Sequence, residues 1–146
     1  MRTGLSLRVL LLAGAVSVGP FVWTAPAFAS PKSQQLVDQG VADLGAEKWR
    51  EALAKFLAAS VADPGDHEAQ FFQGVALNRL GGHAAALRQI ERARAAGVTN
   101  ANMDYELGWA LLGSGRYQDA IAAFERYDSG STKLGKTREL MARAYL

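Results

Sequence analysis

The sequence predicts an all-α protein of three similar, stacked helix pairs with one further helix at the C-terminal end. Small residues recur at a fixed interval, because Gly40, Gly74 and Gly108 stand 34 residues apart. Apolar residues follow them at the spacing of a helical face, and glycine-rich or polar stretches separate the helical segments. A period of this length is typical of arrays whose units each form one supersecondary element.

Further columns keep the same register. The repeated positions are Ala52, Ala86 and Ala120, then Phe56, Ile90 and Phe124 four residues later, with Trp49, His83 and Tyr117 three residues before the alanines. A residue four places after another lies on the same side of a helix. We therefore expect the glycine and alanine columns to mark a close crossing of two helices, with the Phe or Ile column filling the space beside it.

Turn residues divide each unit in two. Gly45, Gly81-Gly82 and Gly113-Ser114-Gly115 are expected to supply the left-handed or flexible backbone between paired helices. Asp63-Pro64-Gly65-Asp66, Gly97-Val98-Thr99-Asn100 and Ser129-Gly130-Ser131 are expected to end each pair. The resulting units cover residues 33–66, 67–100 and 101–134, and a terminal helix covers 136–146.

These columns resemble the tetratricopeptide repeat, a helix-turn-helix unit with small residues at its eighth and twentieth positions. Pro64 matches the proline often found near the end of such a unit. The resemblance covers residues 33–146 and implies a right-handed α-solenoid. It also implies that the first helices of the units line a concave surface that binds a segment of another protein.

Carried over position by position, the resemblance assigns a groove to the second and third units and the terminal helix. Its expected lining is Phe71, Phe72, Val75, Asn78, Arg79, Tyr105, Glu106, Trp109 and Arg143. Aromatic anchors with a polar rim are typical of protein-binding surfaces. For Phe71, Tyr105 and Trp109 a second interpretation stays open, in which the rings join neighbouring units.

The first 29 residues have the layout of a secretory signal. Arg2 and Arg8 precede an apolar run over 9–18, and Ala27-Phe28-Ala29 places small residues where a signal peptidase reads. Pro20 interrupts the run before it reaches the length of a membrane-spanning helix. We expect cleavage, an exported periplasmic or secreted domain over 30–146, and no membrane span in that domain; a retained anchor is the alternative.

Charge and composition restrict the function. The chain has 16 Lys and Arg and 14 Asp and Glu, and removal of Arg2 and Arg8 leaves the basic and acidic residues equal in number. A neutral domain does not favour nucleic-acid binding. There is no Cys; His83 is expected to be structural, and the group Asp63, Asp66, His67 and Glu68 is expected to be a polar turn. No enzyme, cofactor or metal is expected.

Two functions follow. The first is a non-catalytic adaptor or scaffold of the cell envelope that holds a partner segment in its groove. The alternative is a structural subunit that self-associates, forming a homodimer through the exposed side of the terminal helix, where Leu140, Met141, Ala144 and Tyr145 lie. A plain cap that closes the array is the competing role of that helix.

Overall fold

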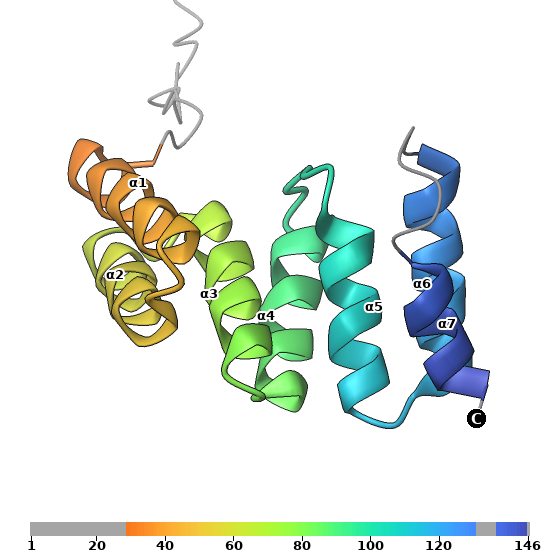
Figure 1. Ribbon diagram of the computed structural model, residues 1–146. Helices are drawn as coiled ribbons and strands as arrows, with labels where there is room; N and C mark the ends of the chain where they lie inside the picture. The colour runs from red at the N-terminus through yellow and green to blue at the C-terminus, as the bar shows by residue number, and fades with distance from the viewer. Residues whose placement is uncertain (1–28, 131–136, 146) are drawn as a thin grey trace, which may run out of the picture.

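The computed structural model describes residues 29–130 and 137–145, and these residues form seven α-helices. The helices are α1 (Pro31–Gly45), α2 (Trp49–Ala62), α3 (His67–Arg79), α4 (His83–Ala95), α5 (Met103–Gly113), α6 (Tyr117–Gly130) and α7 (Arg138–Tyr145). Figure 1 shows three helix pairs side by side, with α7 against α6. The prediction of an all-α solenoid is confirmed. The expected signal segment, apart from Ala29, lies outside the described residues, as do 131–136 and 146.

The units stack through two kinds of contact. Each first helix touches the next first helix, α1 with α3 and α3 with α5, and each second helix touches the first helix of the following unit. The pairs α1–α2, α3–α4 and α5–α6 pack most extensively. This nearest-neighbour stacking is the arrangement of a solenoid. Its buried residues form two hydrophobic clusters, one within the first two units and one from α3 to α7, and Leu44 and Phe72 pack against both.

Three glycines allow the helices of each pair to approach. A methyl group on Gly40 would lie 2.5 Å from Phe56 Cε1, one on Gly74 would lie 2.5 Å from Ile90 Cγ1, and one on Gly108 would lie 2.5 Å from Phe124 Cε1. The alanines Ala52, Ala86 and Ala120 are fully buried beside them, as are Phe56, Ile90 and Phe124. At each crossing, the Phe or Ile side chain of the second helix therefore lies directly over the glycine of the first helix.

The turns between paired helices use one left-handed residue. It is Glu47 in the first unit (φ 59°), Gly81 in the second (φ 80°) and Gly115 in the third (φ 76°), again 34 residues apart. Gly45 was the expected turn residue of the first unit, but it is the last residue of α1. The left-handed position lies two residues later, where glutamate accepts a backbone conformation that glycine adopts without strain.

Polar side chains tie the first unit to the second. Asp66 caps α3, since its Oδ1 accepts from the Ala69 amide at 3.0 Å, and its Oδ2 accepts from the buried Ser33 hydroxyl at 2.5 Å. Asp63 accepts from the Ser30 amide at 2.8 Å. These carboxylates therefore hold helix ends and the turn around the exposed Pro64.

Candidate functional site

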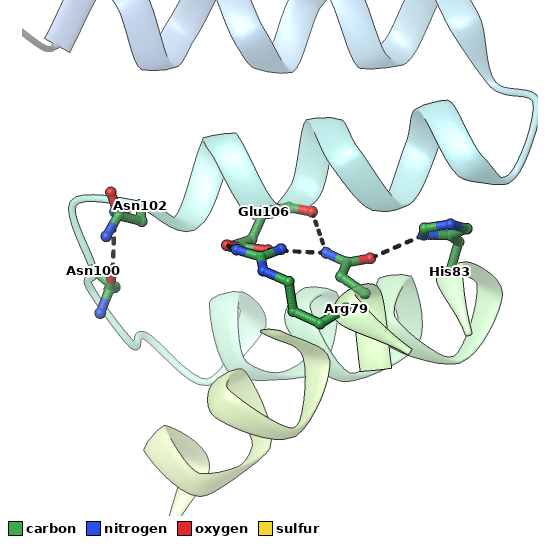
Figure 2. A network of polar contacts seen from close by, with 6 residues as sticks. Arg79, His83, Asn100, Asn102 and Glu106 are labelled. Carbon is green, nitrogen blue, oxygen red and sulfur yellow. Dashed lines mark hydrogen bonds and ion pairs between the residues drawn. The ribbon is translucent and has the colours of Figure 1, made fainter. Parts of the chain in front are cut away.

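A buried carboxylate lies at the junction of α3 and α5. Glu106 accepts two hydrogen bonds from the Arg79 guanidinium, at 3.1 Å and 2.6 Å, and one from the Asn78 amide group at 3.1 Å. Its side chain is only 5% exposed, whereas that of Arg79 is 31% exposed. Figure 2 shows the guanidinium and Glu106 face to face between the two helices. This forked pair joins the second unit to the third and neutralises the carboxylate.

His83 extends this network toward the end of α5. The Asn78 Nδ2 donates to the Glu106 main-chain oxygen at 2.9 Å, so the Asn78 Oδ1 faces the other way and lies 3.4 Å from His83 Nδ1 (Figure 2). The imidazole also lies directly over the backbone of Gly113, where an added methyl group would be 2.2 Å from the ring. Position 113 therefore has to be glycine for His83 to occupy this place.

A pocket of about 240 Å³ opens beside this histidine. Its lining comes from three helices of different units, namely the start of α4, the last turns of α5, and α7: His83, Trp109, Leu112, Gly113 and Arg143. Trp109 and Leu112 are partly buried and pack against the core, while Arg143 is exposed. The pocket thus combines an apolar wall with a cationic group.

Of the expected groove residues, only Trp109 and Arg143 meet in this pocket. Phe71 and Val75 are core residues, 1% and 9% exposed, and Asn78 and Glu106 are 2% and 3% exposed. The expectation that these four residues line an accessible groove is therefore wrong. Asn78 and Glu106 bond to each other between α3 and α5, and Phe71 and Val75 belong to the hydrophobic core, where close packing excludes solvent and a partner.

Phe72 and Tyr105 are half-buried and point toward different neighbours. The Phe72 ring stacks on Phe56 of the preceding unit at 5.4 Å between centroids. Tyr105 lies 5.3 Å from the ring of Tyr127 and 6.2 Å from that of Phe124, within its own unit. Burial raises the pKa of the Tyr105 phenol, and the charge of Glu106 adds to this effect. Because Phe71 is buried, it does not form an exposed aromatic surface with Tyr105 and Trp109.

His83, like Leu112 and Gly113, lines the pocket but is not among the groove residues expected from the sequence. It occupies the aromatic column shared with Trp49 and Tyr117, which suggested a purely structural role. The sequence feature that indicates this placement is Gly113, at the end of a helix. A glycine there leaves room for a ring from the aromatic column to lie on the backbone.

The terminal helix packs inward through part of its apolar side. Leu140 and Ala144 are each 7% exposed, and Met141 packs partly buried against the core. This burial suits a cap for the array, and Leu140 is not free to serve as a dimer contact. The Tyr145 side chain lies outside the described residues, and self-association through this helix stays a prediction.

The described residues were also compared with the requirements of a membrane span and of a metal site. Within residues 29–130 and 137–145, no helix combines the length and apolar character needed to cross a bilayer. In the same ranges no three His, Cys, Asp or Glu side chains gather as metal ligands would. In the expected polar turn Asp63 accepts from the Ser30 and Gly65 amides and Asp66 from the Ala69 amide, and His67 Nδ1 lies 3.2 Å from Gln70 Oε1.

Comparison with known proteins identifies the repeat. The profile of the tetratricopeptide repeat matches residues 37–97 and 79–133, which together make up more than half of the chain. The chain belongs to the tetratricopeptide repeat family. The overlap of the two matched ranges around α4 reflects a repeat that continues through the middle unit. No curated protein sequence shows significant similarity to this tetratricopeptide repeat chain as a whole.

Solved tetratricopeptide repeat structures share the fold at low sequence identity. The first such domain of Spaghetti (RPAP3), bound to an HSP90 peptide, is 18% identical with a TM-score of 0.67, covering 78% of this chain and 90% of that one. The domain of Arabidopsis OM64 is 18% identical (TM-score 0.66; 77% and 93% covered). The Yersinia enterocolitica secretion chaperone SycD, in complex with a YopD peptide, is 17% identical (TM-score 0.57; 77% and 86% covered).

Proposed function

We propose that this protein is an interaction module that holds a segment of another protein against α5 and α7 and catalyses no reaction. The observation that carries the proposal is the pocket in which Trp109 and Leu112 face Arg143. A partly buried Trp beside a charged group, at the edge of a rigid helical array, has the composition of an anchor site for a partner side chain.

Similar proteins support this function. The RPAP3 domain was solved with an HSP90 peptide and SycD with a YopD peptide, so the shared fold accepts protein segments in both cases. At this level of identity the likeness concerns the fold, and the choice of partner rests on residues specific to this chain.

The place of action that we propose is the cell envelope, in the periplasm or outside the cell. The support is the order of a basic start, an apolar run and the small residues Ala27 and Ala29 in the first part of the chain. An adaptor or scaffold exported in this way acts on partners that are themselves exported or anchored in the envelope.

Selection from a displayed library of random peptides tests the binding role directly. The full chain is expected to enrich a limited set of peptides, and Trp109→Ala is expected to lose that enrichment. The reason is that the substitution removes the apolar wall of the pocket, while the helices continue to stack through residues that the substitution leaves in place. Circular dichroism checks that the helical signal of the variant matches that of the parent.

Tyr105→Ala is the matched control, because it removes an aromatic ring one turn earlier on the same helix. Tyr105 packs on Tyr127 and Phe124 within the unit. We therefore expect this variant to have a lower melting temperature and, below that temperature, to enrich the same peptides as the parent. Equal loss of enrichment in both variants, or no enrichment by the parent, would contradict the proposed function.

A further inference from the structure

We infer that the pocket between α4, α5 and α7 takes the side chain of a glutamate from the partner segment. This inference rests on the proposed function and specifies the residue that anchors the segment. Three features of the site carry it: an available cation, an apolar wall of matching size, and a lining in which none of the described residues is acidic.

Arg143 supplies the cation. It is exposed on α7 and lines the pocket, and within the described residues it forms no ion pair, whereas Arg79, Arg94, Arg116 and Arg126 each contact a carboxylate. A guanidinium offers a fork of donors that matches the two oxygens of a carboxylate. Arg143 is therefore the pocket residue able to bind an acidic group of a partner.

The nearby charges favour the same ligand. Glu106 is the acidic residue of the polar network beside His83, and Arg79 already neutralises it through two hydrogen bonds. Arg88 lines a neighbouring hollow that also includes His83 and Gly113. A carboxylate that enters the pocket thus meets Arg143, with Arg88 in the adjoining hollow, and a Lys or Arg side chain would meet charge of its own sign.

The apolar wall selects the length of the acidic side chain. Trp109 and Leu112 lie beside Arg143, so a ligand must contact apolar surface and end in a negative charge. Glutamate does both, since its methylene groups can cover the wall while its carboxylate reaches the guanidinium. A volume of about 240 Å³ is below that of sites for drug-sized ligands, so it suits one side chain.

Peptides selected by the full chain test this inference. They are expected to share a glutamate whose replacement by glutamine weakens binding about tenfold or more, the effect of losing a hydrogen-bonded charge pair. Arg143→Glu should weaken the same peptides to a similar extent. Arg92→Glu, which makes the same charge change at an exposed position of α4, should leave the affinity within about twofold of the parent.

The outcomes separate this inference from the function on which it rests. If the parent selects no peptides, the binding function itself fails. If it selects peptides that lose enrichment with Trp109→Ala but bind Arg143→Glu as tightly as the parent, the function stands and the glutamate pocket is wrong. Amidation of the peptide C-terminus decides the source of the carboxylate, because loss of binding on amidation would point to a terminal carboxylate and overturn the inference.

Discussion

Phe124→Ala is expected to lower the free energy of unfolding by about 3–5 kcal/mol, the largest effect that we predict for a single substitution. The Phe124 side chain is fully buried and lies directly over Gly108. Its removal leaves a cavity that the rigid crossing of α5 and α6 cannot close, because the helices already touch through small residues. Chemical denaturation followed by circular dichroism measures the loss.

Tyr117→Ala provides the control, since it removes an aromatic side chain from the same helix. Tyr117 is 51% exposed, so its loss should change the free energy of unfolding by less than about 0.5–1 kcal/mol. If the two variants are equally stable, Phe124 does not fill the crossing, and the contact between glycine and large side chain is not what holds the units together.

Glu106→Ala is expected to cost about 3 kcal/mol, the second largest effect. The substitution leaves the Asn78 amide group without its carboxylate partner. It also leaves the Arg79 charge unpaired at a junction that water reaches poorly. The value lies at the lower end for a broken buried pair because the Arg79 side chain is 31% exposed and keeps some contact with water. The same denaturation experiment measures it.

Asp119→Ala is the control, because it breaks a carboxylate–arginine pair that is exposed to solvent. Asp119, in the first turn of α6, and Arg116, the residue before that helix, are 56% and 52% exposed, with 2.7 Å between Oδ2 and the guanidinium. Solvent screens such a pair, and we expect a loss of less than about 1 kcal/mol. A loss of unfolding free energy as large as that of Glu106→Ala would mean that burial does not explain how strongly the Arg79–Glu106 pair stabilises the protein.

The repeat made most of the fold predictable from the sequence. Gly40, Gly74 and Gly108 mark one position in three units, and the physical requirement behind that position, a close helix crossing, is the same each time. A pattern repeated three times constrains the backbone more firmly than local propensity does. The left-handed residue of the first unit is not predictable from this pattern, because Glu47 occupies the position that glycine holds in the other two units.

The site was less predictable because a periodic pattern does not say which neighbour a side chain meets. Phe72 and Glu106 occupy the same position in successive units, and both point at the preceding unit. One of them makes a ring stack with Phe56, the other an ion pair with Arg79. Repeat position therefore determines direction, while the chemistry of the contact depends on the residue opposite, which lies 16 positions earlier for Phe72 and 27 positions earlier for Glu106.

Photo-crosslinking in cells that make the protein tests the central claim, that a partner binds at the end of α5. Benzoylphenylalanine replaces Leu112, which lines the pocket, or Leu57, which is 50% exposed on α2 and is not among the pocket residues. The account predicts a discrete adduct with another protein from position 112 and none from position 57. Adducts from position 57 alone, or from neither position, would contradict it.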